Sequence, residues 1–110
     1  MEEELLKNID EFLESGKDNL EKGRFNASVS DYFKAIAVMC DYILYKEIKI
    51  TPKNHNDRFL LLKKYFKDIY EETSRLFRIY TESYNLRLNK EDAVKIKNYA
   101  DELRNKLNKE

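Results

Sequence analysis

The sequence predicts an all-α protein: a single domain over residues 1–110, folded as an up-down antiparallel four-helix bundle. Residues that form turns are scarce, because the chain holds only two glycines, Gly16 and Gly23, and one proline, Pro52. Between these points apolar residues recur at the helical spacing of three or four positions. No segment shows the alternation with a period of two that marks a strand. The short connections favour long helices that lie antiparallel.

The first helix is expected from about residue 3 to residue 22. Gly16 interrupts its apolar stripe and would let a neighbouring helix approach closely. Gly23 supplies the positive φ that commonly follows the last turn of a helix, so it is expected to end this one. The stripe consists of Leu5, Leu6, Ile9, Phe12, Leu13 and Leu20.

The second helix is expected to begin at a cap provided by Asn26 or Ser28 and to end near residue 47. Its main apolar seam steps by four, three, four and three residues, the spacing of a packed helix. Further apolar residues widen that seam, which predicts the central helix of the bundle or a helix with a second buried surface. The main seam contains Val29, Phe33, Ile36, Cys40 and Ile43, and the residues that widen it are Tyr32, Ala35, Met39 and Leu44.

Residues 48–57 contain the proline and several polar residues, so we expect the longest loop there, with Asn56 or Asp57 capping the third helix. That helix is expected to run without a break from residue 58 to residue 84, about 40 Å in length. Its apolar stripe is rich in aromatic residues and comprises Leu62, Tyr65, Phe66, Ile69, Thr73, Leu76, Phe77, Tyr80 and Tyr84.

A tight turn over residues 85–89 leads to the last helix, which is expected to start at Asn89 and to reach the end of the chain. Asp92, three residues after Asn89, gives a near capping box. The seam of this helix contains Ala93, Ile96, Ala100, Leu103 and Leu107.

The charges and the single cysteine restrict the classes of partner and compartment. Twenty-one basic and twenty-one acidic residues cancel, so no net field attracts nucleic acid or an anionic membrane. Cys40, the only cysteine, cannot form an intramolecular disulfide and indicates a reducing compartment. The acidic start differs from a signal peptide, and no apolar run approaches the ~20 residues that span a bilayer. We therefore expect a cytoplasmic protein without a membrane partner.

The sequence presents no complete catalytic or metal-binding constellation. The only histidine, His55, falls in the predicted loop and no glutamate falls in an apolar seam, so neither a metal nor another cofactor is expected. Cys40 lies on an apolar helix face, which favours an inert core thiol over a nucleophile. A glycine-rich phosphate loop is also missing. We therefore predict no catalytic residue.

The aromatic residues of the third helix allow two interpretations. Helical phase turns most of them inward, so the stripe as a whole is predicted to be core. Near the end of the helix, Tyr84 is close in sequence to Arg78 and Arg87, and there a stacking surface for nucleotide bases is an equal alternative.

Four segments carry a more specific pattern. A helix ends at Gly23, and the next opens with small residues, the aromatic pair Tyr32 and Phe33, and then Ala35. A loop with a histidine precedes the third helix. The end of the third helix, from Arg78 onward, is followed by a turn into the last helix. Taken in this order over about residues 10–108, these features resemble the HEPN domains (higher eukaryotes and prokaryotes nucleotide-binding). The segments are residues 16–35, 50–55, 78–84 and 89–93.

The resemblance implies a bundle of four or five helices, frequent dimers and one of two roles. Some HEPN proteins are metal-independent ribonucleases that act as toxins or defence effectors and carry an arginine followed, about four to six residues later, by a histidine. Others are inactive partners or accessory domains, often paired with a minimal nucleotidyltransferase. Here Arg78 matches the arginine, whereas Ser83, Tyr84 and Asn85 stand where the histidine would be. Tyrosine, with a reference pKa of about 10, is a poor proton carrier at neutral pH.

The leading hypothesis is therefore a non-catalytic HEPN-like protein that forms a homodimer and binds a partner protein, such as a nucleotidyltransferase, or a nucleotide or RNA. Its expected ligand-binding residues are Arg78, Tyr84, Arg87 and His55. One alternative is a ribonuclease of the toxin or defence type, in which the long loop or a second copy brings His55 to Arg78. Another is a purely structural adaptor bundle.

Overall fold

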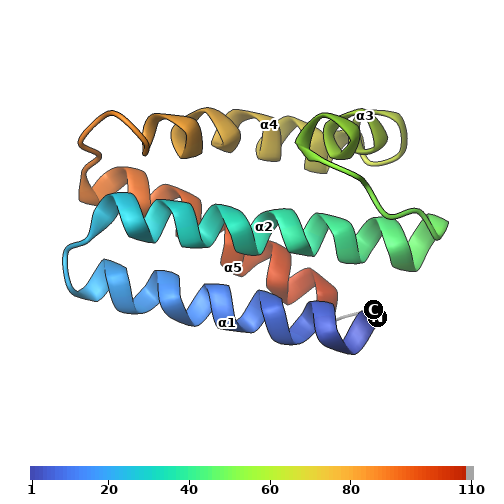
Figure 1. The fold of residues 1–110 in the computed structure, drawn as a ribbon, viewed down its shortest axis with the longest axis horizontal. Coiled ribbons are helices and arrows are strands. Elements are labelled where there is room, and N and C mark those ends of the chain that lie inside the picture. Colours follow the sequence, from blue (N-terminus) through green and yellow to red (C-terminus); the bar gives the residue numbers. More distant parts are fainter. Residues whose placement is uncertain (109–110) are drawn as a thin grey trace.

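The computed structural model describes residues 1–108, which form five helices and no strand (Figure 1). The predicted all-α class is confirmed, but the chain has one helix more than the predicted four. The helices are α1 (Glu2–Glu21), α2 (Phe25–Ile48), α3 (His55–Tyr65), α4 (Lys67–Glu82) and α5 (Lys90–Asn108).

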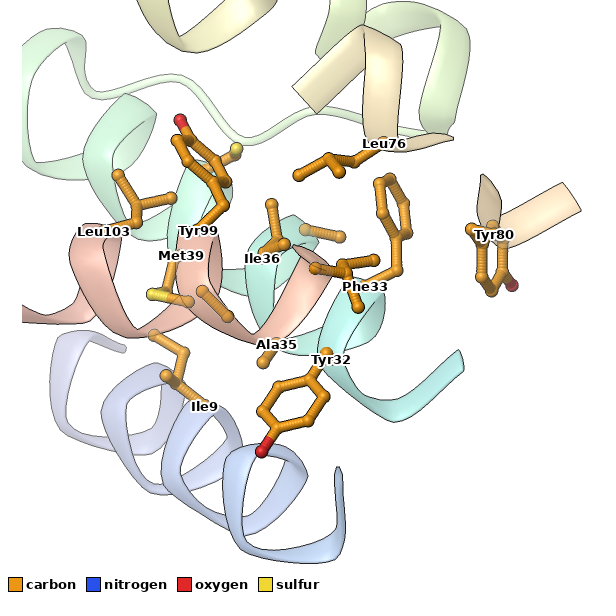
Figure 2. Close-up of a cluster of buried hydrophobic side chains, with 14 of the residues drawn as sticks. Ile9, Tyr32, Phe33, Ala35, Ile36, Met39, Leu76, Tyr80, Tyr99 and Leu103 are labelled. Carbon is orange, nitrogen blue, oxygen red and sulfur yellow. The ribbon is translucent and has the colours of Figure 1, made fainter. Parts of the chain in front are cut away.

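Helix α2 lies at the centre and packs against each of the other four helices. In Figure 1, α1 lies along one side of α2, α4 along the opposite side, and α3 crosses the start of α4. Half of the 24 residues of α2 are buried, including every residue of the main seam and of its predicted widening. Figure 2 shows that different sides of α2 face different helices: Tyr32 points toward α1, whereas Phe33 points toward Leu76 of α4. The prediction of a central second helix is confirmed.

Helices α1 and α2 approach closely at Gly16. A Cβ atom added to Gly16 would lie 2.9 Å from two ring carbons of Tyr32, so only glycine leaves room for that buried ring. Ser28 was predicted as a possible cap of α2, but its hydroxyl instead donates to the carbonyl oxygen of Gly16 at 2.8 Å. Gly23 has a φ of +75° and ends α1 as predicted.

The predicted cap of α2 at Asn26 is also wrong. Arg24 occupies the N-cap position and makes no capping hydrogen bond through its side chain. The amide of Asn26 instead donates to the carbonyl oxygens of Ser83 at 2.8 Å and Leu86 at 2.6 Å. Its side-chain oxygen accepts from the backbone N–H of Leu88 at 3.0 Å. These bonds across the fold hold the α4–α5 connection, and they occupy the groups that a cap would need.

The single third helix predicted over residues 58–84 is broken at Phe66, whose backbone (φ −141°, ψ 67°) separates α3 from α4. The reason is a contact between distant residues. Phe59 and Phe77 would lie about 27 Å apart along one straight helix. With the break, their ring centroids are 5.1 Å apart in an edge-to-face arrangement. Tyr65 and Tyr84, predicted in the apolar stripe, are 44% and 74% exposed.

Helix α3 begins earlier than predicted. Its cap is Asn54 rather than Asn56 or Asp57, and the side-chain oxygen of Asn54 accepts from the backbone N–H of Asp57 at 2.8 Å. His55 is therefore the first helical residue and not part of a loop.

The start of α5 is as predicted. The backbone N–H groups of Asn89 and Asp92 each donate to the side chain of the other at 3.0 Å, a reciprocal capping pair. Along residues 1–108, no helix combines the length and apolar character needed to cross a bilayer.

Replacing Gly16 with Ala should destabilise the fold by about 1–2 kcal/mol, because overlap with the Tyr32 ring outweighs the ~1 kcal/mol gain in helix propensity. Urea unfolding of the purified variant measures this change. In a Tyr32→Leu background the ring is absent, so Gly16→Ala should become neutral or stabilising. An equal penalty in both backgrounds would contradict the proposed contact.

Candidate functional site

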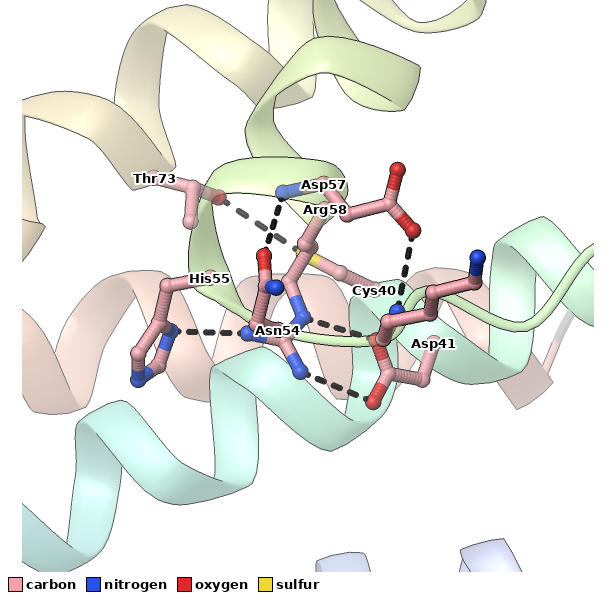
Figure 3. A network of polar contacts seen from close by, with 8 residues as sticks. Cys40, Asp41, Asn54, His55, Asp57, Arg58 and Thr73 are labelled. Atoms are coloured by element: carbon pink, nitrogen blue, oxygen red, sulfur yellow. Dashed lines mark hydrogen bonds and ion pairs between the residues drawn. The ribbon is translucent and has the colours of Figure 1, made fainter.

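Arg58 connects α3 to α2 through a bidentate ion pair (Figure 3). Its Nε lies 2.7 Å from Asp41 Oδ1 and its Nη2 lies 3.0 Å from Asp41 Oδ2. The two side chains are only 12% and 20% exposed, so solvent screens the pair weakly. The remaining nitrogen, Nη1, lies 2.8 Å from Nδ1 of His55.

This contact fixes the state of His55. A guanidinium can only donate, so Nδ1 accepts and the proton of the neutral ring is on Nε2. Burial, followed by the positive charge of Arg58, lowers the pKa of His55 below its usual value. The ring also packs against aromatic neighbours, with centroid distances of 6.2 Å to Phe33, 5.2 Å to Phe77 and 6.3 Å to Tyr80. His55 is thus held as a neutral ring at the junction of three helices.

Five rings form a continuous row along α3 and α4, which we call the aromatic row. Centroid distances are 6.4 Å from Tyr70 to Phe59, 5.1 Å from Phe59 to Phe77, 5.9 Å from Phe77 to Tyr80 and 5.5 Å from Tyr80 to Tyr84. The hydroxyls of Tyr80 and Tyr84 are 2.6 Å apart. Burial, together with this hydrogen bond, raises the pKa of Tyr80 to about 12, so its hydroxyl stays protonated at neutral pH.

Two adjoining surface hollows share Tyr70, the first ring of the row. The α3 hollow has a volume of about 450 Å³ and places the Lys63 ammonium 5.8 Å from the centroid of the Tyr70 ring. The α4 hollow has a volume of about 550 Å³ and contains Arg78. The α3 hollow is lined by Asn56, Phe59, Leu60, Lys63 and Tyr70, and the α4 hollow by Tyr70, Glu71, Ser74, Arg75 and Arg78.

The four residues predicted to bind a ligand lie around this row, but not in one pocket. His55 and Tyr84 both lie beside Tyr80, with ring-centroid distances of 6.3 Å and 5.5 Å. Arg78 lines the α4 hollow. Arg87 lines another hollow of about 310 Å³ beside the α1–α2 connection, together with residues 23–27. The structure therefore separates the two arginines and links the histidine to the tyrosine.

Sequence reasoning did not anticipate the roles of Arg58, Lys63 and Asp41. Their contacts join residues that are distant in sequence, and no glycine or proline signals the break at Phe66. Before the structure, Tyr70 stood out only as one of the aromatic residues of the predicted third helix.

Cys40 belongs to a buried polar contact rather than to the aromatic row. Its Sγ lies 3.8 Å from the hydroxyl oxygen of the fully buried Thr73. Thr73 also lies close to Tyr99 of α5, so three helices meet at this contact. Burial raises the pKa of the Cys40 thiol to about 12, so it stays protonated at neutral pH. The prediction of a core thiol is confirmed by its complete burial.

No family model matches the chain. Searches of curated proteins and of solved structures likewise gave no match. Over the described residues 1–108, no group of three or more His, Cys, Asp or Glu side chains is placed to hold a metal ion. The features of the structure that bear on function are therefore the two hollows and the aromatic row.

Arg58→Ala should lower the free energy of unfolding by about 1–3 kcal/mol, because it leaves a largely buried carboxylate, Asp41, without its partner. Urea unfolding gives the size of the loss, and hydrogen exchange should show faster opening of α3. Lys22→Ala is the matched control, since it removes an exposed ion pair with Asp18 and should cost less than about 0.5 kcal/mol. Equal losses in the two variants would contradict the anchoring role.

The lowered pKa of His55 predicts a loss of stability in mild acid. Between the lowered folded value and the unfolded value of about 6.5, the unfolded state binds more protons. Stability from this group is therefore full above about pH 6.5 and falls as the pH drops through the folded pKa. The free energy of unfolding, measured between pH 5 and 8, should vary less in His55→Phe than in the unmodified protein. The same pH profile in both proteins would disprove this assignment.

Proposed function

We propose that this chain is a non-catalytic HEPN-like accessory protein that acts as a dimer and binds a nucleotide or a short stretch of RNA on the face formed by α3 and α4. The ordered sequence features support the family. The adjoining hollows that share Tyr70 support the ligand, and this observation carries the proposal. The same proposal includes a cytoplasmic location, expected from the single cysteine and the acidic start, and a nucleotidyltransferase partner, which the resemblance implies.

The chemistry of the two hollows suits an aromatic base that carries a phosphate. The half-buried rings of Phe59 and Tyr70 offer apolar faces for stacking. Within residues 1–108 the guanidinium of Arg78 forms no ion pair, whereas Arg75 is paired with Glu72. Arg78 is therefore available for a phosphate. The carboxylate of Glu71 in the same hollow can accept hydrogen bonds from ribose hydroxyls.

The state of the titratable groups supports binding over proton transfer. Nδ1 of His55 is occupied by Arg58, and its ring faces Phe77 rather than the α4 hollow. The hydroxyl of Tyr84 is hydrogen-bonded to Tyr80. A ribonuclease would need a general base within hydrogen-bond reach of the RNA bound at Arg78. The adaptor alternative would leave the two hollows without a role.

Titration with ATP and with a fluorescein-labelled twelve-nucleotide oligouridylate tests the ligand. Both probes should shift the amide resonances of Tyr70, Ser74 and Arg78 in two-dimensional NMR spectra. Arg78→Ala should weaken binding at least fivefold, because it removes a charge-assisted hydrogen bond to phosphate. Lys34→Ala, which removes one positive charge from the exposed surface of α2, is the matched control and should bind normally.

Other outcomes point elsewhere. A larger effect of Arg87→Ala than of Arg78→Ala would move the ligand to the hollow beside the α1–α2 connection. Cleavage of the oligouridylate that disappears in Arg78→Ala would support the ribonuclease alternative. No resonance shift with either probe at 1 mM would contradict nucleotide binding.

A further inference from the structure

One end of the bundle gathers most of the exposed apolar side chains. At this end α1 begins, α2 ends and α3 lies across the start of α4 (Figure 1), and we call it the α3 end. Of the six exposed large hydrophobic residues within 1–108, four belong to it. They are Met1 (59% exposed), Ile50 (37%), Leu60 (68%) and Tyr65 (44%).

The α3 end also carries both signs of charge, on opposite sides. The first turn of α1 presents three exposed carboxylates, those of Glu2, Glu3 and Glu4. In Figure 1 the start of α1 lies on one side of α2, and α3 lies on the other. Around α3, exposed ammonium groups outnumber the exposed carboxylates of Glu47 and Asp68. They are Lys49, Lys53, Lys63, Lys64 and Lys67.

We propose that two copies of the chain meet end to end through the α3 end, related by a two-fold axis. This inference rests on the proposed function, because it names the interface of the proposed dimer. A two-fold axis between the two charged sides places the acidic turn of each copy opposite the lysines of the other. The exposed side chains of Ile50, Leu60 and Tyr65 are then covered between the copies.

A second copy fits this end better than other partners of the lysines. Nucleic acid or an anionic lipid surface would be attracted by the lysines, but Glu2, Glu3 and Glu4 at the same end would repel it. An identical copy matches both signs at once. It also covers apolar area that a phosphate backbone would leave exposed.

The size of the end sets the strength of the contact. The principal extents of the molecule are 38 × 24 × 21 Å, so the end measures 24 × 21 Å. Each copy therefore offers roughly 500 Å², and the total of about 1,000 Å² is at the lower limit for a specific interface. We expect a dissociation constant in the micromolar range or weaker. Added salt should weaken the contact further, since exposed charges are screened over about 10 Å at 0.1 M.

Reciprocal charge reversal tests the geometry. One variant carries Glu2→Lys, Glu3→Lys and Glu4→Lys, and the other carries Lys53→Glu, Lys64→Glu and Lys67→Glu. Each variant alone faces like charges at both contacts and should sediment as a monomer at concentrations where the unmodified protein dimerises. An equimolar mixture restores opposite charges at both contacts, so it should form a heterodimer.

Two controls show whether a loss of dimerisation comes from the interface itself or from unfolding or the overall change in charge. Thermal unfolding followed by circular dichroism verifies that each variant is folded. A third variant with Lys34→Glu, Lys90→Glu and Lys95→Glu makes the same change in charge on other exposed surfaces and should dimerise normally. If reversal of the α1 turn unfolds that helix, Ile50→Glu, which lies outside both hollows, replaces it as the disrupting change.

An unmodified protein that stays monomeric at 0.5 mM and low salt would overturn this inference. So would a mixture of the two reversed variants that remains monomeric, or a dimer that survives both reversals. Loss of oligouridylate binding on lysine reversal in a monomeric protein would assign these lysines to nucleic acid instead. Because every variant retains Arg78, Tyr70 and Lys63, the ligand assay reports on the proposed function separately.

Discussion

The burial of α2 is the constraint on which the rest of the structure depends. Half of its residues are inaccessible to solvent, so the helix has to be covered on nearly every side. No single partner can do this. Tyr32 is covered by α1, Phe33 by α4, and the end of the helix, near Asp41, by α3. The break between α3 and α4 follows from the same requirement, because one straight helix could not both lie along α2 and fold back to pack Phe59 against Phe77.

Features that depend on neighbours in sequence were predictable, and those that depend on distant contacts were not. The helical seams, the positive φ of Gly23 and the reciprocal cap of Asn89 and Asp92 are local, and the structure has them as expected. Asn26 and Phe66 were misjudged for a common reason. The amide of Asn26 has bonds available across the fold that are worth more than a cap. Phe66 is an ordinary residue for a helix, and only the packing of its neighbours favours the break.

The candidate site shows the same division between local and distant features. Arg78 was proposed through the resemblance to the HEPN domains, and His55 as the only histidine in the sequence. Their surroundings were not predictable, because the partners of His55 lie on α2, α3 and α4, and Tyr70 of the α4 hollow packs against Phe59 of α3. The position of Arg58 is the clearest case. Two nitrogens of its guanidinium donate to Asp41 and the third donates to His55. One side chain therefore holds α3 in place and also sets the tautomer of the histidine.

The buried hydroxyl of Thr73 has a consequence for how the helices align. Its oxygen lies 3.8 Å from Cys40 Sγ of α2, close to Tyr99 of α5, and its neighbours in the core are mostly apolar. Sliding α4 by one helical turn would shift Thr73 by about 5.4 Å and separate it from the Cys40 thiol, while apolar side chains could still find contacts. Stranding that hydroxyl would cost about 1–3 kcal/mol. A single small polar group thus favours one alignment of α4 against its neighbours. Apolar side chains alone would leave alternative alignments nearly equal in free energy.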